Sequence, residues 1–264
     1  MNTPPAVPPP PSGPSPRELA RLDLESHLTD PARKQAFVTP MFEHIAPRYD
    51  DFTRLFSFGM DARWKAELMA WFERSMPLRG EVLDVACGTG DLAFAAAHAR
   101  PEARVRGVDT ATGMVQRARQ RVPAADLQRV TFEVGDLTQL PFPDGSVDAV
   151  LAGYALRNVP DHAQALRELR RVLRPGGHLY TLDFHRPRNA LWRELFLAYL
   201  QLSGGLVGWW WHRAPVVYSY IAHSIRHFVT ADEFQRTLRM NGFTLRQESR
   251  YLGGGIALVH ALTR

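Results

Sequence analysis

The stretch Val82-Leu-Asp-Val-Ala-Cys-Gly-Thr-Gly-Asp91 joins a short apolar run to a turn that contains two glycines. The alanine-rich segment Asp91–Ala99 follows and has the composition of a helix. A strand, a glycine turn and a helix in this order are typical of folds that bind nucleotide-type cofactors, because glycine lets the backbone approach a ligand closely. The stretch therefore predicts the start of an α/β sheet and the place of a cofactor site.

The alternation of apolar runs and helical patterns continues to residue 184. Predicted strands cover Val82–Val85, Val105–Val108, Val130–Val134, Val147–Ala152 and His178–Phe184. Predicted helices cover Asp91–Ala99, Gly113–Arg121 and Asp161–Leu173, and the last is stopped by Pro175-Gly176-Gly177. This alternation implies right-handed βαβ units and a parallel sheet with helices on both faces.

The C-terminal third changes the pattern. Residues 190–228 read as a helical insertion, and a helix over Thr230–Asn241 follows, with Thr230 as its N-cap and Gly242 as its stop. Two closing strands, Phe243–Tyr251 and Ile256–Thr263, are joined through three consecutive glycines. We therefore predict an α/β fold with a seven-stranded, mostly parallel sheet and a helical insertion before the last two strands.

Length and composition indicate one ordinary globular α/β domain, since the chain has 264 residues, of which 45% are hydrophobic and 22% charged. Half of the first sixteen residues are proline, so residues 1–16 are expected to be disordered or polyproline-like. A short polar helix is expected at about Arg17 to Leu28. The predicted organisation is a tail over 1–35 and a catalytic domain over 36–264.

The same composition argues against several classes of protein. The single cysteine, Cys87, excludes an internal disulfide framework, and no Cys-x-x-Cys or His-x-x-x-His cluster suggests a metal. The formal charge of +5 comes mostly from scattered arginines, so we predict no nucleic-acid partner, although an anionic membrane surface would suit them. The start does not resemble a secretory signal, and the longest uncharged run, Leu195 to Trp211, is short for a spanning helix. We expect a cytoplasmic protein, with membrane association as an alternative.

Carboxylates follow the predicted strand ends. Asp84 ends the first strand, Asp109 follows the second, and Asp136 comes just after the third. Because the carboxyl ends of parallel strands share one edge of the sheet, these groups should surround the glycine turn. Asp109 lies 19 residues after Gly90, about the spacing at which an acid binds ribose hydroxyls in such folds.

The glycine turn also fits the dinucleotide pattern Gly-x-Gly-x-x-Gly/Ala, through Gly88, Gly90 and Ala93. A dinucleotide would place a pyrophosphate at the helix N-terminus, where Asp91 and Asp84 would repel it. S-adenosylmethionine carries an ammonium and a sulfonium, which carboxylates attract. The pattern favours a methyltransferase over a dehydrogenase. A third interpretation treats the aspartates as helix caps on a structural turn.

Within the methyltransferase interpretation, Asp84 and the turn Gly88-Thr89-Gly90 hold the methionine part of the cofactor. Asp109 accepts from the ribose hydroxyls, and Asp136 accepts from the adenine amino group. Leu137 packs beside the adenine ring, and Met114 packs on its other face or belongs simply to the core.

Several longer segments resemble the menaquinone/ubiquinone biosynthesis C-methyltransferases, from about Met41 to the C-terminus. The segments are Met41-Phe-Glu-His-Ile-Ala-Pro-Arg-Tyr-Asp50, Ser57-Phe-Gly with Trp64-Lys65, Leu83–Asp91, Leu140-Pro-Phe-Pro-Asp144, Leu156-Arg-Asn-Val159, Arg171-Val-Leu-Arg-Pro-Gly-Gly177, Tyr218-x-Tyr220 and Ser224-Ile-Arg226. The glycine turn and Leu-Pro-Phe-Pro are shared by many class I methyltransferases, whereas the first, fifth and last two are more specific.

The resemblance implies a class I methyltransferase Rossmann-like fold. It also implies S-adenosyl-L-methionine as cofactor and a demethylated, prenylated quinol as acceptor, of the demethylmenaquinol type. Cofactor contacts are implied at Thr89, Asp109, Asp136, Leu137 and the position of Gly153, which is usually serine in the family.

The chain departs from the family pattern at four places. Asp51-Phe52-Thr53 stands where Met-Asn is usual, Asp61 replaces a histidine, Asp183-Phe-His185 replaces Glu-x-Ser, and His223 replaces an acid. Several of these positions are expected near the acceptor. They leave open a methyltransferase that acts on oxygen or nitrogen of another hydrophobic small molecule. A non-catalytic subunit that binds the cofactor is a further alternative.

Methylation of an aromatic carbon requires alignment of the carbon with the methyl group and stabilisation of the phenolate. Arg157 is our candidate for the stabilising charge, since it stays protonated, although it could instead form a salt bridge that holds its loop. Asn158 and Tyr49 could orient the hydroxyl or a water, although Tyr49 could also be a packed aromatic of the N-terminal segment. His185 is an alternative base or, instead, a surface loop histidine.

Large aromatic residues gather in the insertion: Trp192, Phe196, Tyr199 and Trp209-Trp210-Trp211. Tryptophan is apolar with one N–H and suits a lipid boundary or a hydrophobic tunnel. The insertion could cover a prenyl tail or make a peripheral membrane contact. The alternatives are a homodimer interface and the core of the domain.

Overall fold

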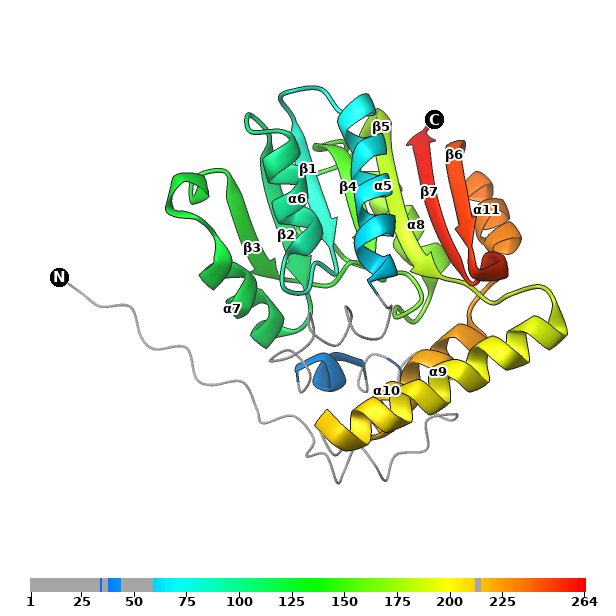
Figure 1. Ribbon diagram of the computed structural model, residues 1–264. Coiled ribbons are helices and arrows are strands. Elements are labelled where there is room, and N and C mark those ends of the chain that lie inside the picture. The colour runs from blue at the N-terminus through cyan, green and yellow to red at the C-terminus, as the bar shows by residue number, and fades with distance from the viewer. Residues whose placement is uncertain (1–33, 35–37, 44–58, 212–214) are drawn as a thin grey trace.

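The computed structural model describes residues 34, 38–43, 59–211 and 215–264, with side chains omitted for 204–219. The expectations for the proline-rich tail and for Arg17 to Leu28 lie outside these residues. Seven strands form one sheet in the order β3-β2-β1-β4-β5-β7-β6 (Figure 1). The strands are β1 (Glu81–Val85), β2 (Arg104–Asp109), β3 (Val130–Val134), β4 (Val147–Gly153), β5 (Leu173–Phe184), β6 (Phe243–Tyr251) and β7 (Ile256–Thr263).

The first five strands are parallel, and β7 runs antiparallel to both β5 and β6. The chain passes from β1 outward to β2 and β3, then returns to place β4 on the other side of β1. This reversal of strand order lies between β1 and β4, and ligands of such sheets bind outside the carboxyl ends of the strands at this point. The topology therefore places a ligand site beside Asp84.

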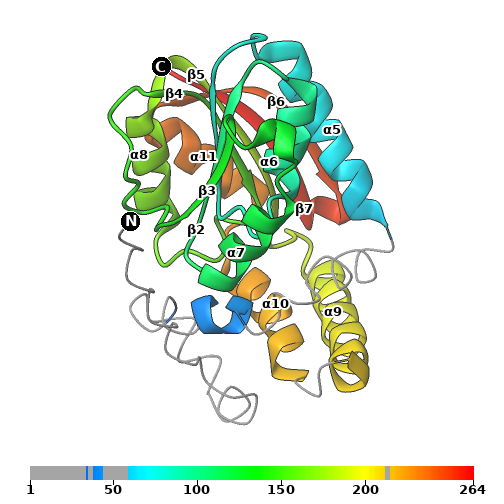
Figure 2. The same ribbon diagram turned by 90° about the vertical axis from the view of Figure 1, so that its left-hand side faces the viewer.

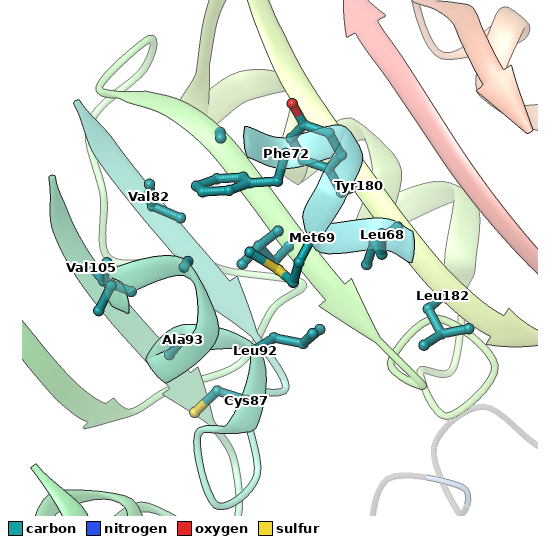
Figure 3. Packing of buried hydrophobic residues seen from close by; sticks show 14 of the residues in the cluster. Leu68, Met69, Phe72, Val82, Cys87, Leu92, Ala93, Val105, Tyr180 and Leu182 are labelled. Carbon is teal, nitrogen blue, oxygen red and sulfur yellow. The ribbon is translucent and has the colours of Figure 1, made fainter. Parts of the chain in front are cut away.

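Helices cover both faces of the sheet (Figures 1 and 2). One face carries α5 (Met60–Ser75), α6 (Asp91–Ala99) and α7 (Thr112–Arg121), and the other carries α8 (His162–Val172) and α11 (Ala231–Met240). Figure 3 shows Leu68 and Phe72 of α5 and Leu92 of α6 packed over the strands of the first face, where Val82 of β1 and Tyr180 of β5 lie.

Most predicted elements are confirmed, and α6, β3, β6 and β7 have the predicted bounds. Two helix starts also agree: Asp161 caps α8, and Thr230 and Glu233 form a capping box at the start of α11. The predicted start of β5 at His178 is wrong. The strand begins at Leu173, directly after α8, where Leu173 pairs with Val147 of β4. The register shift between Val147 and Ala149 absorbs the intervening Pro-Gly-Gly, where Gly176 has φ +75°.

Helix α5 was not among the predicted elements. It buries Trp64, Leu68, Trp71 and Phe72, a helical spacing that the sequence does contain. Its N-terminal end lies near the carboxyl ends of the strands, so its polar residues reach the predicted site.

The insertion consists of two helices, α9 (Ala190–Trp211) and α10 (Pro215–His227), which pack against each other. Both lie beyond the carboxyl ends of the parallel strands, on the side of the predicted site (Figure 1). Among the described helices, none is long and apolar enough to cross a bilayer.

Candidate cofactor and acceptor site

A cavity opens where the topology places it, at the carboxyl ends of β1, β2 and β4. Its empty space is about 950 Å³, a volume that includes the open solvent at its mouth. The residues that line it are Val38, Phe42, Lys65, Asp84, Ala86, Cys87, Gly88, Thr89, Asp91, Leu92, Asp109, Thr110, Met114, Gly135, Asp136, Leu137, Gly153, Tyr154, Ala155, Asn158 and Val159. Of the predicted cofactor residues, this set contains all but Gly90.

Asp84 is the most deeply placed carboxylate of the cavity, with 1% of its surface exposed. Its Oδ2 accepts a hydrogen bond of 2.9 Å from the backbone N–H of Ala93 in α6. Burial raises the pKa of Asp84 to about 8, and the nearby Asp109 adds to the effect. A cation in the cavity would favour the ionised carboxylate, so this site fits the ammonium of S-adenosylmethionine.

The glycine turn connects two of the predicted ligand groups. Gly88 has φ +54°, and its backbone N–H donates to Asp109 Oδ2 at 2.8 Å. Gly90 lies behind the turn with φ +90°, and a Cβ there would lie 2.8 Å from the Phe132 ring. Gly90 therefore provides the backbone conformation and packing space for the turn, while Gly88 and Thr89 line the cavity.

Asp109 ends β2, Asp136 lies two residues beyond the end of β3, and both line the cavity. Asp109 Oδ1 accepts from the backbone N–H of Ala111 at 2.8 Å, and burial raises the pKa of this carboxyl. Asp136 Oδ1 accepts from the backbone and the hydroxyl of Thr138, both at 2.8 Å. Met114 and Leu137 are 1% and 5% exposed and line the same space, so Met114 belongs to both the core and the cavity wall.

Gly153 stands where the family usually has serine, and it packs closely against Leu92 in the cavity wall. A Cβ at Gly153 would lie 2.6 Å from Leu92 Cδ1. Leu92 occupies the space that a serine side chain would need, so Gly153 can contribute only backbone atoms to the cavity wall.

The structure corrects the role of Asp91 in the electrostatic argument. Lys65 Nζ lies 3.2 Å and Arg121 Nη2 3.0 Å from this carboxylate. Although burial acts to raise it, these two cations hold the pKa of Asp91 below its ordinary value. Asp91 is thus a compensated charge, and the preference for a cationic ligand rests on Asp84 and Asp109.

Arg157 does not line the cavity. It is 5% exposed, and its Nε lies 3.3 Å from Asp183 Oδ1 at the end of β5. Its Nη1 donates to Asn158 Oδ1 at 2.5 Å, and Asn158 does line the cavity. The salt bridge considered as an alternative for Arg157 is therefore present, and its charge borders the cavity through the amide of Asn158.

Asn158 also links the cavity to the insertion. Tyr220 of α10 donates from its hydroxyl to Asn158 Oδ1 at 2.8 Å, and Asn158 Nδ2 donates to the carbonyl of Tyr154 at 2.7 Å. Asn158 is thereby held by the loop that follows β4 and by α10. Tyr49, the other residue expected to orient the acceptor, lies outside the described residues.

The expectation of a surface position for His185 is wrong. The residue is fully buried between Phe228 and Phe234, with ring centroids at 5.3 and 5.2 Å, because the segment from α10 to α11 covers the end of β5. Burial lowers the pKa of His185 to about 4. It does not line the cavity, so the structure gives it no path to an acceptor there.

Sequence reasoning did not single out Tyr154 and Lys65 as site residues. Tyr154 has φ +56°, lines the cavity and donates from its hydroxyl to Asp61 Oδ1 at 2.7 Å. Lys65 bridges Asp61 and Asp91 at 2.9 and 3.2 Å. The departure at Asp61 was a signal for this contact, but only the fold brings it within reach of Tyr154.

A short helical stretch, residues 38–43, covers part of the cavity through Val38 and Phe42. Polar contacts of three residues, Lys34, Thr39 and Glu43, hold this part of the chain. Lys34 Nζ donates to the carbonyls of Arg157 and Val159 at 2.8 Å, Thr39 and Thr110 join hydroxyls at 3.2 Å, and Glu43 accepts from the backbone N–H of Gly113 at 2.9 Å.

In the insertion, Trp192 and Phe196 stack with ring centroids 6.3 Å apart. Phe196 is buried, whereas Trp192 and Tyr199 are 39% and 40% exposed. The side chains of Trp209, Trp210 and Trp211 lie outside the described residues.

Comparison with known proteins agrees with this geometry. The model of the ubiE/COQ5 methyltransferase family matches residues 30–264. The demethylmenaquinone methyltransferase of Thermus thermophilus is 38% identical over 224 residues, which are 83% of this chain and 98% of that protein. The ubiquinone/menaquinone biosynthesis C-methyltransferase UbiE of Geobacter sulfurreducens is 37% identical over 215 residues, 78% of this chain and 80% of that one.

Among solved structures, the geranyl diphosphate C-methyltransferase of Streptomyces coelicolor A3(2), in complex with geranyl diphosphate and S-adenosyl-L-homocysteine, has a TM-score of 0.57 at 16% identity. The match covers 78% of this chain and 79% of that one. The predicted class I methyltransferase fold is thereby confirmed.

Proposed function

The chain belongs to the ubiE/COQ5 methyltransferase family, and from this premise we propose that it methylates a ring carbon of a demethylated, prenylated quinol of the demethylmenaquinol type. It is an S-adenosylmethionine-dependent methyltransferase of quinone biosynthesis. The observation that carries the acceptor proposal is that one cavity joins the buried carboxylate of Asp84 to the amide of Asn158.

The cofactor side is assigned by chemistry. Asp84 would hold the ammonium group, with Gly88 and Thr89 presenting their backbone to the methionine part. Asp109 would accept from the ribose hydroxyls, and Asp136 from the adenine amino group. Met114, Leu137 and the backbone of Gly153 would enclose the ring. When bound, S-adenosylmethionine supplies a methyl group on a positively charged sulfur, which an electron-rich ring carbon can displace.

The acceptor side needs a positive potential, because a hydroquinone ring becomes a strong carbon nucleophile as its phenol ionises. Arg157 provides a guanidinium next to the cavity wall, held by Asp183, which offsets part of its charge, and by Asn158 on the cavity side. Asn158, fixed by Tyr220 and Tyr154, would present its amide to the acceptor hydroxyl. The ring carbon gains the methyl group, the carbon–sulfur bond breaks, and the ring proton leaves to water.

A second candidate is O- or N-methylation of another hydrophobic molecule. It is favoured by one observation: Asp61, which departs from the family pattern, bonds to Tyr154 in the cavity wall. The departure at His185 gives it no support, since that residue is buried away from the cavity.

The test is methyl transfer from labelled cofactor to reduced demethylmenaquinone, with catechols and aromatic amines as competing acceptors. We expect label on a ring carbon of the quinol. Label on catechols or amines with none on the quinol would overturn the C-methylation proposal. Calorimetry with S-adenosylmethionine and a nicotinamide dinucleotide tests the cofactor separately, and we expect heat of binding only with the former.

A further inference from the structure

Helix α9 carries an apolar face that the described part of the chain leaves uncovered. Its five large side chains are Leu191 (73% exposed), Trp192 (39%), Leu195 (56%), Tyr199 (40%) and Leu202 (75%). At 100° per residue they fall within about 100° of the helix circumference. They therefore form one continuous stripe rather than scattered surface contacts.

The opposite side of α9 is anchored to the protein. Phe196, Leu197 and Leu200 are 4%, 1% and 2% exposed. Trp192 donates from its indole N–H to the carbonyl of Leu252 at 2.7 Å, so its polar end is satisfied while part of its apolar ring reaches the surface. The stripe is thus held on a fixed helix.

The helix that carries the stripe is coupled to the cavity. Helices α9 and α10 pack together beyond the carboxyl ends of the strands (Figure 1). Tyr220 of α10 bonds to Asn158, which lines the cavity. An apolar ligand that entered along the insertion would therefore arrive near the proposed acceptor group.

The charge of the insertion indicates which kind of surface the apolar stripe of α9 fits. The insertion, residues 190–228, contains three arginines, a single glutamate and no lysine or aspartate, which makes a formal charge of +2. Arg193 and Arg226 share Glu194 as their acidic partner, at 3.3 and 2.8 Å, so one glutamate offsets only one of these two positive charges. A basic segment with leucine, tryptophan and tyrosine on one helix face suits an anionic lipid interface.

We propose that the stripe of α9, Leu191, Trp192, Leu195, Tyr199 and Leu202, binds the surface of a membrane that contains anionic phospholipid. This inference rests on the proposed function, because a prenylated acceptor resides in the bilayer. The helix lies in the interface with its apolar side chains among the acyl chains, and the arginines of the insertion contact the headgroups.

The test is flotation of the full chain with vesicles of phosphatidylglycerol and phosphatidylcholine in equal parts, and with phosphatidylcholine alone. The variant Leu191→Gln/Leu195→Gln/Leu202→Gln should bind the anionic vesicles about tenfold less tightly or worse. The matched control is Leu78→Gln/Leu127→Gln/Met240→Gln, which changes three apolar side chains that are 65%, 59% and 86% exposed on other elements. The control should bind like the parent chain, and both should bind phosphatidylcholine alone weakly.

Equal vesicle binding by the parent and the α9 variant would overturn the proposal. Light scattering gives a second way to overturn it: a parent dimer that the α9 substitutions convert to a monomer would make the stripe an interface between two copies. Activity separates this inference from the proposed function. The α9 variant should methylate a short-tailed quinol in solution like the parent, but a long-tailed quinol in vesicles more slowly. Vesicle binding without methylation of any quinol would support the stripe of α9 as a membrane-binding surface but contradict the proposed quinol acceptor.

Discussion

Asp84 couples cofactor binding to pH at the scale of a single residue. In the free protein burial raises its pKa to about 8, so the carboxyl is protonated at neutral pH. The cofactor's ammonium favours the ionised form, so binding should release a proton and affinity should rise with pH up to about 8. Well below this pKa, the cofactor affinity can rise by about tenfold per pH unit.

Calorimetry in two buffers with different ionisation enthalpies measures this proton release. Asp84→Asn should bind the cofactor more weakly, with a reduced pH slope and less proton release. Identical proton release by the parent and the variant would assign the effect to another group, with Asp109 next in line because burial raises its pKa as well.

Arg157 and Asp183 form a buried pair whose two members have separable roles. Arg157→Met should lower turnover by about 100-fold, through loss of the charge beside the phenolate, with cofactor affinity little changed. The same change leaves Asp183 buried without its cation, which should also destabilise the fold by about 3–5 kcal/mol.

The double variant Arg157→Met/Asp183→Asn removes the unpaired charge. We expect it to recover much of the stability in a urea titration but none of the turnover. Recovery of turnover together with stability would mean that Arg157 only holds its loop.

At the scale of elements, residues 38–43 are positioned against α7 by Glu43, whose carboxylate accepts from the backbone N–H of Gly113 in the first turn of that helix. Glu43→Gln should weaken this contact and displace Val38 and Phe42 from the cavity wall. We expect cofactor affinity to fall about three- to tenfold, on the scale of one charged hydrogen bond.

Glu102→Gln is a suitable control for Glu43→Gln, because Glu102 is exposed and pairs with Arg79 away from the cavity. Calorimetric titration with S-adenosylmethionine measures the cofactor affinity of both variants. The affinity of Glu102→Gln should match that of the parent. An unchanged affinity in Glu43→Gln would show that residues 38–43 do not contribute to cofactor binding.

At the scale of the whole molecule, two buried groups contribute pH slopes of opposite sign to the stability of the free enzyme. His185 has its pKa lowered to about 4, so the unfolded chain binds more protons than the folded one between about pH 6.5 and 4, and stability falls as the pH falls through that range. Asp84 has its pKa raised to about 8, so its contribution falls as the pH rises from its unfolded value of 3.8 toward 8.

Urea unfolding from pH 4 to 9 tests these signs. Each group contributes a slope of at most about 1.4 kcal/mol per pH unit. Between about pH 4 and 6.5 the two slopes nearly cancel in the parent, so His185→Gln should expose a fall in stability as the pH rises through that range. Saturating S-adenosylmethionine should flatten the fall between about pH 6.5 and 8, since the cofactor favours ionised Asp84. An unchanged acid-side profile in His185→Gln would contradict the burial of His185, and a parent profile that is flat between about pH 6.5 and 8 would contradict that of Asp84.

The sequence by itself determined the sheet, most helices and the edge that carries the cofactor residues. Apolar periodicity and capping residues are local, so α6, β3 and α11 could be read from short windows. The carboxyl ends of parallel strands meet at one edge whatever the details of packing, so Asp84, Asp109 and Asp136 could be placed together before their contacts were known.

Only the tertiary structure decided what each of the other side chains does. Arg157 meets Asp183 from 26 positions along the chain, Leu92 fills the space beside Gly153, Phe132 packs behind Gly90, and Phe228 and Phe234 enclose His185. Each of these contacts joins separate elements of the fold. Local patterns encode which face of an element is buried, whereas the partner of a buried group depends on how distant elements dock.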